Sequence, residues 1–244
     1  MSAPTPASAS TTAFGTANPH ALATILEASE TRRIIAATDI FDISGIKLWA
    51  ANQPVSADLQ RRLLDRKLRR PLESCLIAED GVNSLTLVEA VQALAESNDA
   101  LAPLVRAHGA RLIKEAAHLP LHPAAQLLLT AGQTSRPASF DHAVKAMALA
   151  GALAAAQRGD TSEVRVAMLC GLLHDLGEMY IDPRYGEVEA DRDLDLTSYQ
   201  QLVVHPHVGY LLLAQLTNYP RNVAQAVAEH HERLDGSGYP HAVT

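Results

Sequence analysis

The carboxyl-terminal half of the chain holds most of the residues that can bind a metal ion. Seven of the eleven histidines lie after residue 140. The positions that stand out are His142, the pair His174 and Asp175, His205, and the pair His230 and His231. Imidazole is a ligand for first-row transition metals, and a carboxylate can bridge two of them. Taken singly, each position is better explained by a structural role, so the residues alone leave both interpretations open.

The adjacent histidines begin a longer motif, which reads HHERLDGSGYP over residues 230–240. Its glycines allow backbone conformations that are closed to other residues. We therefore expect a tight loop beside the two imidazoles, formed by Asp235, Gly236, Gly238, Tyr239 and Pro240.

Helices must bring these positions together. After Pro137 the apolar residues follow four helical patterns, at about 139–157, 163–181, 197–217 and 220–232. Each pattern carries at least one histidine. The expected fold is mainly α, with a helical bundle at the carboxyl end over residues 133–244.

A smaller unit of mixed structure precedes this bundle. Residues 1–20 are rich in Ala, Ser, Thr and Pro and are predicted to be a disordered tail. Residues 21–80 are expected to form a small α/β subdomain, with a strand, a turn at Ser44 and Gly45, and a second strand. Ser56 is predicted to cap a helix that carries Leu59, Leu63, Leu64 and Leu68 on one face.

Residues 81–132 are expected to be a helical connector, with Thr86 and Glu89 at capping-box spacing. The helix before it carries a basic run over residues 61–70. Such a run could bind phosphate or a partner, but a solvated helix face is the favoured interpretation.

Composition restricts the function. The net charge of −7 argues against a general nucleic-acid binder, whose affinity needs a basic surface. No stretch is apolar for long enough to predict a membrane span, and no secretory signal is evident. Cys75 and Cys170 are expected to be free thiols. We therefore expect a cytoplasmic protein.

The motifs in combination resemble those of the HD-GYP family of metal-dependent phosphohydrolases. The glycine- and tyrosine-containing motif of residues 230–240 lies downstream of HD-x-G at residue 174 and HP-x-x-G at residue 205, in the family's order. The resemblance covers roughly residues 135–244. It implies an HD-type helical bundle with two divalent metal ions, iron or manganese, and hydrolysis of cyclic di-GMP by a hydroxide that both metals activate.

The resemblance also implies roles for individual residues. His142, His174 and Asp175 would bind the first metal, with Asp175 as the bridge to the second. His205, His230 and His231 would complete the second site. His174 and Asp175 would be catalytic residues, and Glu178, which the family does not share, is added to them as a candidate. The loop at residues 235–240 would recognise the cyclic dinucleotide or dock a GGDEF-domain partner.

Three positions depart from the family pattern. Glu178 stands where the family has a lysine, and is expected to be an extra metal ligand or a general acid or base, or else a carboxylate that faces solvent or lies between helices. Ala138 replaces the glutamate that binds a third metal. The sequence stops at Thr244 before the family's last aspartate ligand, so either the domain is truncated or the first metal site has lost a ligand. The alternative function is a catalytically silent module that binds cyclic dinucleotide or a partner; hydrolysis of another nucleotide phosphate is less favoured.

Overall fold

The computed structural model describes residues 13–186 and 196–243, and the fold is mainly helical, as predicted. The elements follow in this order: α1 (Pro19–Ser29), β1 (Ile34–Ala36), β2 (Ile40–Phe41), β3 (Lys47–Trp49), α2 (Ala57–Leu63), the 3₁₀ turn η1 (Leu72–Ser74), β4 (Leu76–Ala78), α3 (Ser84–Glu96), α4 (Ala102–Ala116), α5 (Pro123–Ser135), α6 (Pro137–Ala156), α7 (Thr161–Leu173), η2 (Leu176–Tyr180), η3 (Pro183–Tyr185), α8 (Leu196–Leu202), α9 (His205–Leu216) and α10 (Arg221–Glu229).

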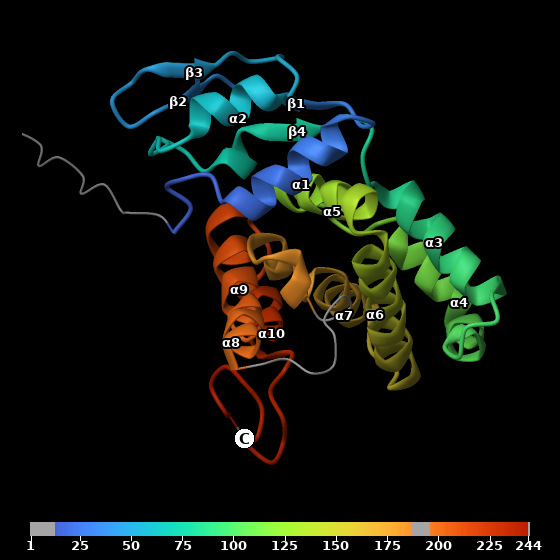
Figure 1. Cartoon of the computed structure of the whole chain (residues 1–244). Helices are drawn as coiled ribbons and strands as arrows, with labels where there is room; N and C mark the ends of the chain where they lie inside the picture. The colour runs from blue at the N-terminus through green and yellow to red at the C-terminus, as the bar shows by residue number, and fades with distance from the viewer. Residues whose placement is uncertain (1–12, 187–195, 244) are drawn as a thin grey trace, which may run out of the picture.

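Two small antiparallel sheets form the amino-terminal unit, which lies at the top of Figure 1. Strand β1 pairs with β4, and β2 pairs with β3 as a hairpin. Asp42 stabilises the hairpin turn, since its carboxylate accepts hydrogen bonds from the main-chain N–H groups of Ser44 and Ile46, both at 2.9 Å. Gly45 has φ of +83°, a conformation that favours glycine, so the predicted turn is in place.

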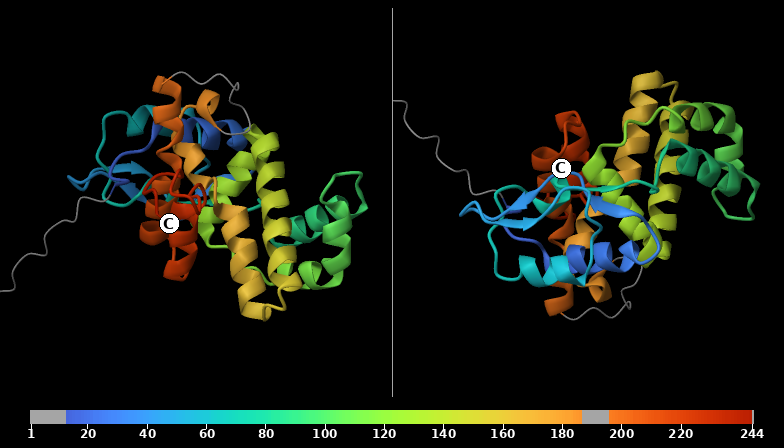
Figure 2. Two further views of the ribbon diagram at one scale, coloured as in Figure 1. Left: turned by 90° about the horizontal axis from the view of Figure 1, so that it is seen from below. Right: turned by 90° about the horizontal axis from the view of Figure 1, so that it is seen from above.

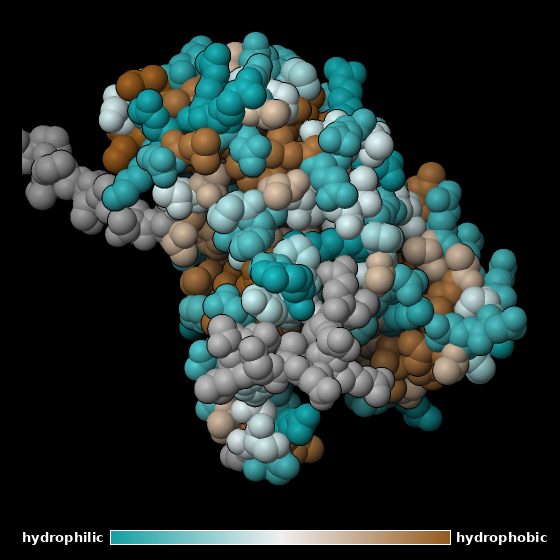
Figure 3. All heavy atoms as spheres, viewed as in Figure 1, coloured by the Kyte–Doolittle hydropathy of each residue, from teal (hydrophilic) through white to brown (hydrophobic). Residues whose placement is uncertain are grey.

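The predicted helix after Ser56 is shorter than expected. Helix α2 ends at Leu63, so Leu64 and Leu68 do not extend its apolar face. Leu64 is 64% exposed, whereas Leu68 is buried and lies opposite Asp42 in an isolated bridge. The outer face of this unit is largely hydrophilic in Figure 3, and the arginines and lysine of residues 61–70 are exposed.

The tail predicted for residues 1–20 is too long. Residues 1–12 lie outside the described part of the chain, but Phe14 is only 6% exposed and packs edge-on against Tyr180, with ring centroids 5.5 Å apart. Asn18 caps α1 by accepting hydrogen bonds from two main-chain N–H groups. The segment from Phe14 onward is therefore part of the folded core.

The connector predicted over residues 81–132 comprises α3, α4 and α5. Helices α3 and α4 pack on each other at one end of the molecule, and the short strands lie at the other end (Figure 2). The N-cap of α3 is Asn83 and its capping box uses Thr86, so the expected box of Thr86 and Glu89 is wrong by one turn.

Helix α5 packs against α1 and β4, and one buried apolar cluster extends from Phe14 to Val227. The core therefore continues across both expected domain boundaries.

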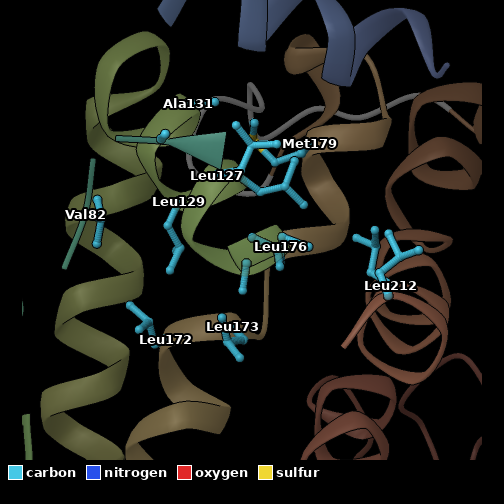
Figure 4. Packing of buried hydrophobic residues seen from close by; sticks show 14 of the residues in the cluster. Val82, Leu127, Leu129, Ala131, Leu172, Leu173, Leu176, Met179 and Leu212 are labelled. Atoms are coloured by element: carbon cyan, nitrogen blue, oxygen red, sulfur yellow. The ribbon is translucent and has the colours of Figure 1, made fainter. Parts of the chain in front are cut away.

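Helices α6, α7, α9 and α10 build the carboxyl-terminal bundle. Helix α6 packs along α7, and α9 along α10. Figure 4 shows side chains from α5, α7 and η2 gathered in the buried core, including Leu127, Leu172, Leu176 and Met179. Within the described residues, no helix is long and apolar enough to cross a membrane.

Candidate metal centre

Asp175 lies at the centre of two groups of metal-binding side chains. His142 and His174 lie with it in one group, and His205, His230 and His231 lie with it in the other. In each group the candidate ligand atoms lie within 4.8 Å of one another. The fold thus brings together all six residues that the resemblance implied as ligands, from segments up to 89 residues apart in the chain.

The two carboxylate oxygens of Asp175 face different histidines. Oδ2 lies 3.0 Å from Nε2 of His174 and 3.4 Å from Nε2 of His142. Oδ1 lies 3.3 Å from Nε2 of His230 and 3.5 Å from Nε2 of His205. One carboxylate therefore serves both groups, which is the arrangement of a bridging ligand.

Three of the histidines lie where a helix begins or ends. The predicted helix at 163–181 ends as an α-helix at Leu173, and His174 is its C-cap. The helix predicted over 197–217 is interrupted, and His205 is the first residue of α9, next to Pro206. His230 is the C-cap of α10.

At these positions each ring is held by a main-chain carbonyl three residues earlier. Nδ1 of His174, His205 and His230 lies 2.7 Å from the oxygen of Gly171, Leu202 and Val227, respectively. A carbonyl oxygen only accepts hydrogen bonds, so Nδ1 carries the proton in each ring. In the neutral rings Nε2 therefore presents its lone pair to the centre, as a metal ligand does.

The donor atoms fit a cation better than they fit each other. Nε2 of His205 and Nε2 of His230 are 3.1 Å apart, and those of His142 and His174 are also 3.1 Å apart. Facing lone pairs repel unless a cation or proton lies between them. Within the described residues, Oδ1 of Asp175 is buried and accepts no well-formed hydrogen bond. The centre therefore suits bound divalent metal.

The environment keeps Asp175 ionised. Burial alone would raise the pKa of its carboxyl, but the contacts with His174, His205 and His230 outweigh burial and lower this pKa far below its usual range. The same carboxylate raises the pKa of His205 against the effect of burial, whereas burial lowers the pKa of His230. An anionic carboxylate among imidazoles is a donor set for first-row transition metals.

The terminal loop folds back onto the second group. The Tyr239 ring stacks on the His231 ring, with centroids 4.5 Å apart and planes 18° apart. Glu232 closes the loop by accepting hydrogen bonds from the main-chain N–H groups of His241 and Val243. Gly238 leaves no room for a side chain, since a Cβ there would lie 2.4 Å from the nitrogen of Arg233.

A groove of about 420 Å³ borders the centre between α6, α7 and α10. Its wall is mostly apolar, with Leu149 and Leu153 on α6 and Cys170 on α7, and His174, His230 and His231 line its inner side. A ligand in this groove would meet both the metal-binding imidazoles and an apolar surface.

Comparison with known proteins identifies this half of the chain. The family model described as HD domain matches residues 127–244. Residues 127–244 belong to the HD domain family. This confirms the predicted family and a divalent metal site, because HD domains bind divalent metal ions. The family match begins within α5, a few residues before the predicted boundary at 133.

Two relatives are similar over parts of their length. A segment of 136 residues, 55% of this chain, is 35% identical to the cyclic di-GMP phosphodiesterase PA4108 of Pseudomonas aeruginosa and covers 32% of that protein. A segment of 83 residues, 32% of this chain, is 35% identical to the cyclic di-GMP phosphodiesterase response regulator RpfG of Xanthomonas campestris pv. campestris and covers 20% of it. The chain thus spans less than a third of either relative. No solved structure matches it.

Glu178 lies close to Asp175 in the chain but belongs to neither group of candidate metal ligands. Its residue is 3% exposed, and it lines a cavity of about 40 Å³ together with Asp175 and Arg136. A role as metal ligand is therefore not supported by its position, while a role in catalysis stays a prediction. Among the described residues, His207 and His241 also lie outside both groups.

Sequence reasoning missed the residues that hold η2, the turn next to Asp175, in place. Arg136 is 5% exposed and donates a hydrogen bond of 2.9 Å from its guanidinium to the main-chain oxygen of Glu178. Tyr180 donates one of 2.6 Å to Glu73. No local spacing signals these contacts, because their partners lie 42 and 107 residues away.

Proposed function

We propose that this protein is a phosphodiesterase that hydrolyses a cyclic dinucleotide, cyclic di-GMP, with two divalent metal ions, iron or manganese. The observation that carries the proposal is that the two carboxylate oxygens of Asp175 face different histidines. Oδ2 faces His142 and His174, and Oδ1 faces His205 and His230. Three donors in one group and four in the other, with Asp175 shared, suit a pair of cations rather than one.

When bound, two such cations supply Lewis acidity and lower the pKa of a coordinated water, which is what phosphodiester hydrolysis needs at neutral pH. The residues of the chain hold the site in shape for that chemistry. The carbonyl acceptors orient three rings, and Asp175 remains anionic. The apolar groove limits water at one side of the centre and offers a surface to a nucleobase.

Cyclic di-GMP is the proposed substrate because both relatives are named as cyclic di-GMP phosphodiesterases. The substrate is anionic and the chain carries a net charge of −7, so bound metal ions would supply the largest positive charge at the site. The product would be the linear dinucleotide or the mononucleotide. The free thiols of Cys75 and Cys170 suit the cytoplasm, where we propose that the protein acts.

The deciding experiment measures metal content and cyclic di-GMP hydrolysis together. Wild-type protein loaded with Mn²⁺ or Fe²⁺ is expected to convert cyclic di-GMP to a linear product. Asp175→Asn keeps the side-chain volume but removes the charge, and should lose at least one metal per chain and nearly all activity. Asp182→Asn is the matched control, because Asp182 pairs with Arg184 at the surface and lies in neither ligand group.

Glu178 can be tested separately from the ligands. We expect Glu178→Gln to keep the metal content and to lower kcat by about 100-fold or more if the carboxyl transfers a proton in the reaction. Unchanged kcat with unchanged metal content would assign Glu178 to packing between η2 and its neighbours.

The alternative is a silent module that binds cyclic dinucleotide or a GGDEF-domain partner. It is favoured by the smaller donor set of the first group and by Leu234, which is 99% exposed in the loop that carries Tyr239. Binding of cyclic di-GMP without turnover by the metal-loaded protein would select this alternative. Partner docking through the loop would be lost in Leu234→Asp without loss of metal.

A further inference from the structure

A buried polar pair joins the amino-terminal unit to the HD domain. The hydroxyl of Tyr180 donates a hydrogen bond of 2.6 Å to Oε1 of Glu73. Glu73 lies on η1, beside β4, and is 3% exposed; Tyr180 ends η2 and is 8% exposed. A buried carboxylate is expensive to desolvate, so a short hydrogen bond to it is a strong local constraint.

The turn η2 is held at two further points, by Asn18 at the start of α1 and by Arg136 between α5 and α6. Asn18 donates from its side-chain amide to the main-chain oxygen of Tyr180 at 3.1 Å. Arg136 donates to the main-chain oxygen of Glu178 at 2.9 Å and reaches the hydroxyl of Thr24 on α1 at 3.4 Å. Glu73 and Asn18 belong to the amino-terminal part of the chain, whereas Arg136 lies within the HD domain and links η2 to α1 through Thr24.

This turn also sets the position of the shared metal ligand. Asp175 immediately precedes η2, and the N–H of Glu178 donates to the main-chain oxygen of Asp175 at 2.9 Å. On its other side η2 touches α9 backbone to backbone, because a Cβ on Gly177 would lie 2.0 Å from the main-chain oxygen of His205. A shift of η2 would therefore move Asp175 relative to His205.

We propose that Glu73 and Tyr180 are positioning residues for the metal centre, and that the amino-terminal unit is a working part of the site rather than a separable sensor. The hydrogen bond between Tyr180 and Glu73 fixes the last residue of η2. Because η2 is a turn of five residues that follows directly on Asp175, this restricts where Asp175 can lie. Each carboxylate oxygen of Asp175 must lie close to its own pair of histidines, so Asp175 tolerates a displacement of only about 0.5 Å. The inference rests on the proposed function only in requiring that the centre binds metal.

The test compares Tyr180→Phe with variants that separate positioning from stability. Tyr180→Phe removes the hydroxyl and should weaken Mn²⁺ binding at least about threefold, less than the 10- to 100-fold typical of a partner bonded to the ligand itself. Glu73→Gln retains an oxygen acceptor and should bind Mn²⁺ as the wild type does. The double variant Glu73→Leu with Tyr180→Phe replaces both polar groups by apolar ones; it should regain thermal stability but not Mn²⁺ affinity.

Leu59→Val is the matched control, because Leu59 is fully buried in α2 of the same unit and away from η2. It should lower the melting temperature without changing Mn²⁺ affinity. Equal losses of affinity in Leu59→Val and Tyr180→Phe would overturn the proposal, as would full affinity in Tyr180→Phe or in the double variant.

Amide hydrogen exchange in metal-free protein gives a second measurement that needs neither metal nor substrate. The proposal requires faster exchange at residues 175–180 in Tyr180→Phe than in Leu59→Val. Equal exchange there would overturn it. If wild-type protein binds Mn²⁺ but does not cleave cyclic di-GMP, the proposed function fails while these comparisons still decide the positioning role.

Discussion

Nε2 of His205 and Nε2 of His230 lie 3.1 Å apart, although each ring donates its Nδ1 proton to a carbonyl three residues earlier. Two neutral rings in this state turn lone pairs toward each other beside the anionic Asp175. The contact is unfavourable without a positive charge between the rings. The helix ends thus hold a geometry that a cation stabilises.

Metal removal should therefore lower stability as well as activity. A cation that binds the folded chain at a concentration 100 times its Kd adds about 2.7 kcal/mol to the free energy of unfolding. Differential scanning calorimetry with Mn²⁺ and then with excess EDTA measures the difference. Asp175→Asn should show a much smaller response to EDTA; an equal response in this variant would place the stabilising ion elsewhere.

A single methyl group at Gly177 should disrupt the contact between η2 and α9. In Gly177→Ala the new Cβ would lie 2.0 Å from the oxygen of His205 and 2.7 Å from the nitrogen of Gly209, and neither main-chain atom can move freely. Overpacking of this kind costs about 1–3 kcal/mol or more, and Mn²⁺ affinity should fall with it. Urea unfolding and Mn²⁺ titration measure the two effects.

Gly109→Ala is the control for this change. Gly109 lies inside α4, and a Cβ there would meet no atom of the described residues within 4 Å. Alanine favours helix over glycine by about 0.4–1 kcal/mol, so this variant should be slightly more stable and should bind Mn²⁺ normally. A destabilised Gly109→Ala with an unaffected Gly177→Ala would contradict the packing described for η2.

The candidate metal ligands could be named from the sequence, and the fold brings them together, but the structures that orient them could not be predicted. The motifs of His174 with Asp175 and of His230 with His231 are local in the chain. The lone-pair direction of each ring depends on where its helix ends, and hydrophobic periodicity extended the helix at 163–181 well past Leu173. Pro206 did mark the start of α9, since proline is favoured in the first turn of a helix, and could have divided the predicted helix at 197–217.

The support of the centre by the amino-terminal unit was beyond prediction from one sequence. Glu73 and Tyr180 are 107 residues apart, and neither belongs to a motif. Phe14 lies in a segment whose composition is typical of disorder, yet its ring packs against Tyr180. Composition describes the average of a segment, whereas the single side chain of Phe14 is enough to anchor the end of this segment in the hydrophobic core.

The stacking of Tyr239 on His231 predicts a direct effect of the terminal loop on the metal centre. Tyr239→Ala removes the ring contact, and aromatic pairs contribute about 0.5–1.5 kcal/mol, so Mn²⁺ affinity should fall by roughly twofold to tenfold. Tyr239→Phe keeps the ring and should bind Mn²⁺ nearly as well as the wild type. A loss in Tyr239→Phe as large as in Tyr239→Ala would assign the effect to the hydroxyl instead of the stacked ring.

The buried carboxyl of Glu73 should make stability depend on pH. Burial raises the pKa of Glu73 above its ordinary value, although the hydrogen bond from Tyr180 acts in the opposite direction. The folded chain then binds this proton more tightly than the unfolded chain does. The stabilising contribution is complete below the ordinary pKa of about 4.3 and is lost as pH rises through the raised pKa of the folded state.

Glu73→Gln removes this loss because glutamine does not ionise, while its oxygen can still accept from Tyr180. Relative to wild type, the variant should therefore gain unfolding free energy between pH 4 and neutral pH, by about 1.4 kcal/mol for each unit by which the fold raises the pKa. Urea unfolding of the metal-free proteins across this range measures the difference. If the difference in unfolding free energy between the variant and the wild type does not change with pH, Glu73 has the same pKa in the folded and unfolded chains. The hydrogen bond from Tyr180 would then offset the whole effect of burial.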